Sequence, residues 1–397
     1  MKKRKITIGT LEIGKYAKQL INKTLDDSRL SYGPLSAKFE NEFANYHDCK
    51  FGIFTASGTC ALQIALHALK SLHNWKDGDE VLVPAVTFIA VSNIVIQNSL
   101  KPVFVDVNSK TYNIDPSQIE KHITKRTRAI IAVHSFGLPA EMDAILKIAK
   151  KHKLKVIEDG CEAVGASYKG KKVGSMGDIG CFSTYVAHII TTGVGGLATT
   201  NNAKYAVKMK SLMNHGRDAV YLSIDDDDKI SKETDKSAFY LIDRRFSFVD
   251  VGYSYRLTEM EAALGLEQMR IIKKIIDKRQ QNAAYLTAGL KKVGRALQLP
   301  GIPNYSKHTY LGYPIVIVDP KVNRTKLILH LEHHGVETRY LMPLINQPVY
   351  KKIFGNLEPK YPVAKKLNAN GFYIGIHQSL TKADLDYIIW VFWEFFK

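Results

Sequence analysis

The chain has 397 residues, of which 45% are hydrophobic and 24% are charged, close to the averages of soluble globular proteins. This length predicts two domains, because a single domain usually contains roughly 100–200 residues. No apolar stretch approaches the roughly 20 residues that span a bilayer, and no apolar signal core follows the basic residues 1–5. We therefore expect a cytoplasmic protein with no membrane partner.

The net charge of +18 raises the question of a nucleic-acid partner. The lysines are spread through every segment, however, and no basic stripe is interleaved with aromatic residues, so we expect no nucleic acid to bind. Some of this charge can attract a phosphorylated substrate. The four cysteines show no metal-binding spacing, and the adjacent His333 and His334 would point apart on a helix. We expect free thiols and no metal.

The first half of the chain alternates helical patterns with short apolar runs. Helices are predicted at 35–46, 60–72 and 89–97, and strands at 50–55, 80–84, 102–106, 129–133, 155–159 and 197–200. Continuous β-branched runs separated by helices are typical of a largely parallel sheet covered on both faces, which is an α/β fold. Ligands bind such sheets at the carboxyl ends of the strands, where residues 55–57, 134–136 and 159–161 lie.

The rest of the chain has a different pattern. Residues from about 218 to 245 contain four successive aspartates at 225–228, and we expect a solvated insertion loop there rather than a cation site. A pair of helices is expected within 257–290, followed by a strand at 313–318 and a helix at 324–334. We predict a large domain over residues 1–250 and a smaller α+β domain over 251–397.

Two glycine-rich segments resemble nucleotide-binding motifs, but each lacks a feature that the motif requires. Residues 165–172 lack the final serine or threonine that a Walker loop needs for magnesium. Residues 193–198 fit G-x-G-x-x-A, but they run into a predicted strand, whereas the dinucleotide motif opens a helix. We therefore expect neither motif to be a nucleotide-binding loop.

Three features at predicted strand ends have the chemistry needed to hold a phosphorylated aromatic ring. Ser57, Gly58 and Thr59 lie between a strand and a helix, where backbone amides can hold a phosphate, although a simple helix cap also explains them. Asp159 ends a buried strand, where a carboxylate can keep a pyridine nitrogen protonated, or can again act as a cap. Phe88 either offers its face to a flat ring or packs in the core.

Several longer motifs, in this order, resemble the DegT/StrS-type sugar aminotransferase family, which has the aspartate-aminotransferase fold. The resemblance covers nearly the whole chain and rests on residues 33–34, 56–59, 83–88, 158–159, 177–183, 195–196, 214–217 and 252–259. It implies a fold-type I enzyme with pyridoxal phosphate or pyridoxamine phosphate as cofactor, and a homodimer with a shared active site. The binding residues it implies are Ser57, Gly58, Thr59 and Ser183 for the phosphate, Phe88 for the ring face and Asp159 for the ring nitrogen.

The chain departs from the aminotransferases of this family where they carry their catalytic lysine. That lysine lies seven residues before a glycine pair, and the same count back from Gly195 reaches His188. Histidine cannot hold the cofactor aldehyde in a stable covalent link, but it is a good general base near neutral pH. The family's sugar 3-dehydratases carry histidine here, and Glu162 also resembles them, because aminotransferases usually have glutamine or histidine at that position. Ser254 stands where the family commonly has an asparagine that reaches the other subunit's cofactor phosphate.

The resulting hypothesis is a 3-dehydratase that acts on a nucleotide-linked 4-keto-6-deoxy sugar. His188 would move a proton from the cofactor's aminomethyl carbon and assist the departure of hydroxide from C3, while Asp159 supports the ring. Glutamate is the expected amino donor, because the cysteines show no iron–sulfur pattern. Glu162 and Ser254 are further candidate cofactor-binding residues. Two alternatives stay open: an aminotransferase whose lysine is replaced by histidine, and a non-catalytic regulator that binds cofactor or sugar nucleotide.

Overall fold

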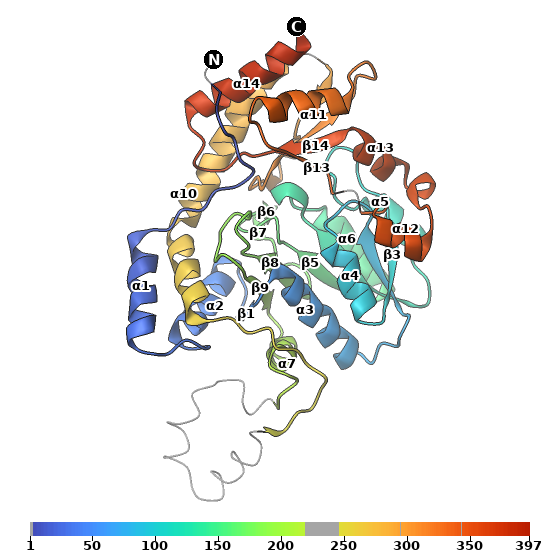
Figure 1. The fold of residues 1–397 in the computed structure, drawn as a ribbon. Coiled ribbons are helices and arrows are strands. Elements are labelled where there is room, and N and C mark those ends of the chain that lie inside the picture. Colours follow the sequence, from blue (N-terminus) through green and yellow to red (C-terminus); the bar gives the residue numbers. More distant parts are fainter. Residues whose placement is uncertain (1–2, 219–245, 294, 343) are drawn as a thin grey trace, which may run out of the picture.

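A computed structural model describes residues 3–218, 246–293, 295–342 and 344–397, and a seven-stranded sheet lies at its centre (Figure 1). The strands are, in spatial order, β1 (Phe51–Thr55), β9 (Gly196–Thr200), β8 (Ile179–Ser183), β5 (Lys155–Asp159), β4 (Thr127–Val133), β2 (Glu80–Pro84) and β3 (Lys101–Val105). β9 runs antiparallel to both of its neighbours, and the other neighbouring pairs are parallel. The predicted α/β fold with a mostly parallel sheet is confirmed.

Helices cover both faces of this sheet, which is why several of its strands contain runs of successive apolar residues rather than an alternating pattern. In β4, Ala129, Ile131 and Val133 belong to the core that contains helices α3 (Gly58–Leu72), α4 (Ala90–Gln97) and α7 (Ala203–Met213). The intervening Ile130 and Ala132 pack on the opposite side with α5 (Pro116–Ile119) and α6 (Met142–His152). Successive side chains of one strand thus pack into two separate cores, one on each face of the sheet.

A second, four-stranded antiparallel sheet follows in the last third of the chain. Its spatial order is β10 (Leu297–Gln298), β12 (Tyr313–Ile317), β14 (Gly371–Ile374) and β13 (Thr338–Tyr340). Helices α11 (Arg324–His333) and α14 (Lys382–Phe396) pack on it through a common core, and α12 (Pro348–Phe354) and α13 (Pro362–Asn370) lie against the large sheet's core. Single 3₁₀ turns occupy Glu120–His122, Ser135–Gly137, Lys291–Val293 and Glu358–Lys360.

The predicted helix pair at 257–290 is wrong, because one 32-residue helix, α10 (Glu259–Leu290), occupies this segment. It begins at a capping box formed by Thr258 and Glu261. Gly265 lies inside this helix. A Cβ there would lie 2.5 Å from the ring of Phe39 in α2 (Pro34–Tyr46), so the missing side chain allows the two helices to approach each other. α10 packs on α1 (Lys15–Asp26) and α2 at one end and on α14 at the other (Figure 1). The predicted domain boundary near residue 250 stays a prediction.

The segments that resemble nucleotide-binding loops form strands. Residues 165–172 contain the hairpin β6 (Ser167–Tyr168) and β7 (Lys171–Lys172), which is extended by β11 (Ser306–Lys307), and residues 193–198 enter β9. Neither segment opens a helix, and the strand expected at residues 197–200 is present. Residues 225–228 and nearly all of the predicted insertion loop lie outside the described residues. No helix in the described part of the chain has the length and apolar character needed to cross a membrane.

Candidate active site

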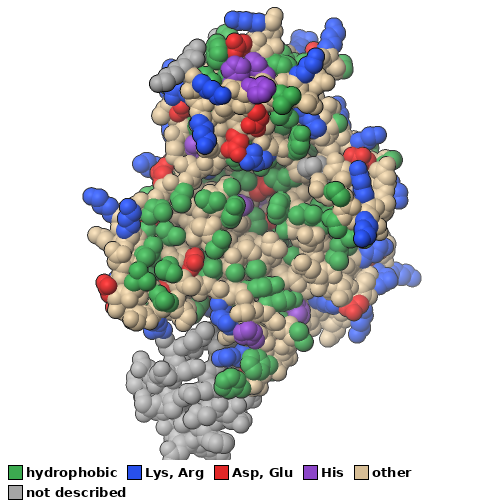
Figure 2. Space-filling model, in the orientation of Figure 1, with side chains coloured by type: hydrophobic (Ala, Val, Ile, Leu, Met, Phe, Trp, Pro, Cys, Tyr) green, Lys and Arg blue, Asp and Glu red, His purple; other side chains and the backbone are tan. Residues whose placement is uncertain are grey.

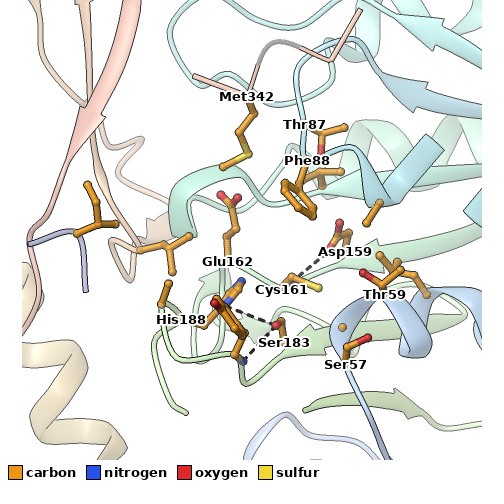
Figure 3. Close-up of a pocket in the computed structure, with 18 of the residues that line it drawn as sticks. Ser57, Thr59, Thr87, Phe88, Asp159, Cys161, Glu162, Ser183, His188 and Met342 are labelled. Atoms are coloured by element: carbon orange, nitrogen blue, oxygen red, sulfur yellow. Dashed lines mark hydrogen bonds between the residues drawn. The ribbon is translucent and has the colours of Figure 1, made fainter. Parts of the chain in front are cut away.

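A cavity of about 360 Å³ lies at the carboxyl ends of the parallel strands, between them and the second sheet (Figure 3). Ser57, Asp159 and Ser183 reach it from the ends of β1, β5 and β8. Most of the predicted site residues line this cavity together: Ser57, Gly58, Thr59, Phe88, Asp159, Glu162, Ser183 and His188. Segments more than 100 residues apart in sequence are therefore brought to one place by the parallel sheet.

The N-terminus of α3 forms one wall of the cavity. Ser57 caps this helix, because its side chain accepts the N–H of Cys60 at 3.1 Å, so the predicted helix cap is present. The next residue has no room for a side chain, since a Cβ on Gly58 would lie 2.8 Å from both Ser183 Cβ and Cys161 Sγ. The first amides of a 15-residue helix, with the hydroxyls of Ser57, Thr59 and Ser183 nearby, fit a phosphate group.

The Gly195–Gly196 pair allows β9 to run close to the N-terminus of α3. A Cβ on Gly196 would lie 2.3 Å from the carbonyl carbon of Ser57, so only glycine allows the strand to approach so closely. Gly195 has a φ of +145°, which disfavours any residue with a side chain. The glycines thus allow β9 to run close to the helix start that forms this wall of the cavity.

Asp159 lines the cavity and is 5% exposed. Its Oδ1 accepts the N–H of Cys161 at 3.0 Å, so it also stabilises the local turn. Burial raises the pKa of Asp159, because a carboxylate loses its hydration there. A cationic N–H donor in the cavity would offset that cost, and the protonated nitrogen of a pyridine ring is such a donor.

Phe88 lines the cavity with 61% of its surface exposed. The alternative that it packs in the core is therefore wrong. Its ring reaches the cavity from the segment after β2 (Figure 3). An aromatic side chain left uncovered at the mouth of a cavity offers a face on which a flat ring can stack. The site thus has a phosphate end, a ring face and a carboxylate for a ring nitrogen, which together fit a pyridoxal-type cofactor.

Glu162 is a second buried carboxyl group in the cavity wall, with 8% of its surface exposed. It accepts the N–H of Phe136. Burial, with a smaller contribution from the charge of Asp159, raises the pKa of Glu162 to about 8. Glu162 is therefore mostly protonated at neutral pH and can donate a hydrogen bond into the cavity.

His188 lies in the turn that follows β8 and faces the cavity, whereas its neighbours Ile189 and Ile190 are buried in the core. His188 therefore differs from Ile189 and Ile190 in lining the cavity instead of packing in the core. Its Nδ1 lies 3.5 Å from the hydroxyl of Ser183 (Figure 3). Burial lowers the pKa of His188 to about 4, so the imidazole is neutral near neutral pH and has a lone pair for a proton.

Ser254 is the one predicted site residue that does not line this cavity. Its Oγ accepts a hydrogen bond from Arg256 at 3.0 Å, and its backbone pairs with Asn214. Its role toward a second subunit stays a prediction. The sequence did not single out several further lining residues. Cys161 and Tyr185 lie within two residues of predicted ones, whereas Ile8, Leu311, Met342 and Tyr373 lie far from them in sequence.

Comparisons with known proteins place this cavity in a family context. The chain is 34% identical to GDP-perosamine synthase of Caulobacter vibrioides over 90% of its own length and 89% of that protein. It is 33% identical to dTDP-4-dehydro-2,6-dideoxy-D-glucose 3-dehydratase of Saccharopolyspora spinosa, over 91% and 80% of the two chains. The structure of Escherichia coli GDP-4-keto-6-deoxy-D-mannose-3-dehydratase with bound hydrated pyridoxal phosphate superimposes with a TM-score of 0.88 at 26% identity, covering 98% and 100%.

Residues 12–392 match the profile of the DegT/DnrJ/EryC1/StrS aminotransferase family, which is nearly the whole chain. The family is one of sugar-modifying enzymes that use pyridoxal phosphate or pyridoxamine phosphate, and the cavity fits that cofactor. The resemblance drawn from the sequence motifs is thus confirmed at the level of the family. The chain belongs to the DegT/DnrJ/EryC1/StrS aminotransferase family.

Proposed function

We propose that this protein is a 3-dehydratase, which uses pyridoxamine phosphate to remove the C3 hydroxyl of a nucleotide-linked 4-keto-6-deoxy sugar. One observation carries the proposal. His188 faces the cavity at the position where aminotransferases of the family carry lysine, and none of the described residues that line the cavity is a lysine. The site therefore has a group that can move protons but none that can hold the cofactor covalently.

Different residues of the cavity wall bind different parts of the cofactor. Ser57, Thr59 and Ser183 hold the phosphate with the N-terminus of α3, and Phe88 covers the ring. When bound, pyridoxamine phosphate supplies an amine for the sugar's keto group and a ring that accepts an electron pair. Asp159 keeps a proton on the ring nitrogen, which makes the ring a better electron acceptor.

His188 and Glu162 provide the hydrogen-bonding and proton-transfer groups. The neutral imidazole of His188 takes up a proton from the cofactor's aminomethyl carbon, and the imidazolium then gives it to the hydroxide that leaves C3. The proton and the hydroxide leave together as water. Glu162, protonated near neutral pH, donates a hydrogen bond to the cofactor. Ser183 lies close enough to His188 to orient its ring.

The relatives support this proposal and also define its main competitor. A 3-dehydratase is among the proteins similar in sequence, and another is among those similar in structure. GDP-perosamine synthases are equally similar in sequence and keep the aminotransferase alternative open. A further relative, 31% identical, is called a pleiotropic regulatory protein, and it keeps the regulatory alternative open. Glutamate as amino donor and a homodimer with a shared active site are parts of the proposal.

Product analysis decides among the three functions. The purified protein is incubated with pyridoxal phosphate, glutamate and, separately, GDP-, CDP-, UDP- and dTDP-linked 4-keto-6-deoxy sugars. Mass spectrometry and NMR then identify the products. A 3-deoxy-4-keto sugar supports the dehydratase. A 4-amino sugar that retains its C3 hydroxyl identifies an aminotransferase and contradicts the proposal. Cofactor binding without any sugar product in the panel favours the regulator.

A further inference from the structure

A group of side chains of the kinds that can bind a metal lies outside the cavity, where α11 and α14 pack together. His330 and His334 lie one helical turn apart at the end of α11, and Glu394 lies in the last turn of α14. One ring nitrogen of each histidine and one carboxylate oxygen of Glu394 all lie within 4.8 Å of one another. Figure 2 shows histidine side chains gathered at this end of the molecule with acidic side chains beside them.

Two backbone carbonyls fix which nitrogen of each ring carries a proton. A carbonyl can only accept, so the 2.8 Å contact between Nδ1 of His334 and the carbonyl of His330 requires a proton on that Nδ1. In the same way, Nε2 of His330 donates to the carbonyl of Val391 at 3.0 Å. In its neutral form each ring thus keeps one nitrogen with a lone pair, while its other nitrogen donates to a carbonyl. Metal-binding histidines are usually oriented in this manner.

The lone pair of His334 has an acidic neighbour. Its Nε2 lies 3.3 Å from Oε2 of Glu394. A proton on Nε2 would make this contact an ordinary ion pair, and a metal ion bound to both atoms would make it one edge of a coordination site. Zinc bonds to nitrogen and oxygen of about 2.0–2.1 Å give a tetrahedral edge of about 3.3 Å between two ligand atoms. The spacing of these two atoms therefore already suits a tetrahedral ion.

We propose that His330, His334 and Glu394 bind a divalent transition-metal ion of the Zn²⁺ class. Two imidazoles and one carboxylate are ligands typical of zinc, whereas magnesium and calcium prefer oxygen alone. The two histidines are half-buried and Glu394 is exposed, so water can occupy the fourth position and Glu394 can move to close the remaining distances. Glu332, between the histidines in sequence, is not a ligand because it accepts two hydrogen bonds from Thr338.

The bound ion would join the C-terminal helix to α11. The group differs from the adjacent pair His333 and His334, where no metal was expected, because residues four apart on a helix share a face and adjacent ones do not. His333 is exposed and is not part of the group. It therefore provides a control histidine directly beside the site.

Zinc titration of the cofactor-loaded full-length protein, without an affinity tag and after dialysis against a chelator, tests this proposal. Calorimetry should show one Zn²⁺ bound per chain. Glu394→Gln and His334→Asn should each weaken binding at least tenfold, and His333→Asn should leave it unchanged. At a hundredfold excess over Kd, Zn²⁺ should raise the Tm of the wild type by about 3 °C and that of Glu394→Gln by much less.

Two results would overturn the metal site. One is the absence of Zn²⁺ binding, which means that only a proton lies between His334 and Glu394. The other is binding that Glu394→Gln leaves intact, which places the ion elsewhere, for example at the half-buried thiols of Cys60 and Cys161. Thermal melts of the variants without zinc verify their folding. None of these outcomes depends on the sugar chemistry of the cavity.

Discussion

The hydroxyl of Ser183 lies 3.5 Å from Nδ1 of His188. Ser183 ends a buried strand that reaches the cavity, and His188 follows it in the next turn. Five residues of sequence therefore separate the proposed phosphate-binding hydroxyl from the proposed proton-transfer group. Burial lowers the pKa of His188, whereas an anion held near Ser183 favours the imidazolium. Cofactor binding should thus make His188 a stronger base.

His188→Asn should abolish release of a 3-deoxy sugar while leaving cofactor binding intact. Asparagine has a similar polar side chain but no basic nitrogen, and Ser57, Thr59 and Asp159 are unchanged. Loss of a general base commonly lowers rates by about 10²–10⁴-fold. Steady-state assays of product formation, together with absorbance titration of pyridoxamine phosphate, measure the two effects separately.

His152→Asn provides the matched control for this substitution. His152 is a histidine at the end of α6, where it pairs with the exposed Glu120 far from the cavity. It should turn over like the wild type. Formation of 3-deoxy sugar by His188→Asn at a rate close to the wild type would exclude His188 as the base.

The wild-type protein should form no covalent link to pyridoxal phosphate that borohydride can trap. The described lining residues include no lysine, and histidine forms no stable link to the aldehyde. Intact mass after reduction should therefore equal that of the unmodified chain. His188→Lys should gain the mass of one reduced cofactor, which serves as the positive control. A reduced adduct on any lysine of the wild type would refute the noncovalent mode of binding.

Much of the site could be predicted because its residues directly follow recognisable strands. Ser57 and Asp159 come after apolar runs whose carboxyl ends must meet at one edge of a parallel sheet. Met342 and Tyr373 could not be predicted in this way. They reach the cavity from the second sheet and its flanking segment, and only tertiary packing brings them there.

Two features of the fold, one not predicted and one predicted wrongly, depend on the tertiary structure. The antiparallel direction of β9 follows from its short connection to β8, which contains no crossover helix. The single helix α10 contains Gly265, which lies against Phe39, a contact between segments more than 200 residues apart. A glycine inside a helical pattern weakens that pattern in the sequence, although here it permits close packing.

Asp159→Asn should lower turnover by about two to three decades with little effect on folding. The asparagine Oδ1 still accepts the N–H of Cys161, but an amide supports a protonated ring nitrogen poorly. Removing a buried carboxylate whose pKa is raised also removes a cost to the folded state. Kinetic assays and thermal melts measure the two effects. Asp143→Asn, which alters an exposed partner of Lys169, is the control. Normal turnover by a folded Asp159→Asn protein would show that Asp159 has another role.

Glu162→Gln should stabilise the protein relative to the wild type, and increasingly so as the pH rises. The pKa of Glu162 is about 8 in the folded chain against an ordinary 4.5, so between these values the folded chain holds a proton that the unfolded chain has lost. The stability that Glu162 contributes is therefore fully present below pH 4.5 and is lost as the pH rises through about 8.

Glutamine keeps an oxygen that accepts the N–H of Phe136 and resembles the protonated acid, but it cannot ionise. The Tm of Glu162→Gln minus that of the wild type should therefore be small at about pH 5 and larger at about pH 9. Glu42→Gln, at an exposed position on α2, should show no such trend. A Tm difference for Glu162→Gln that does not vary with pH would mean that Glu162 is ionised in the cavity. The proposed role of Glu162 as a hydrogen-bond donor would then be wrong.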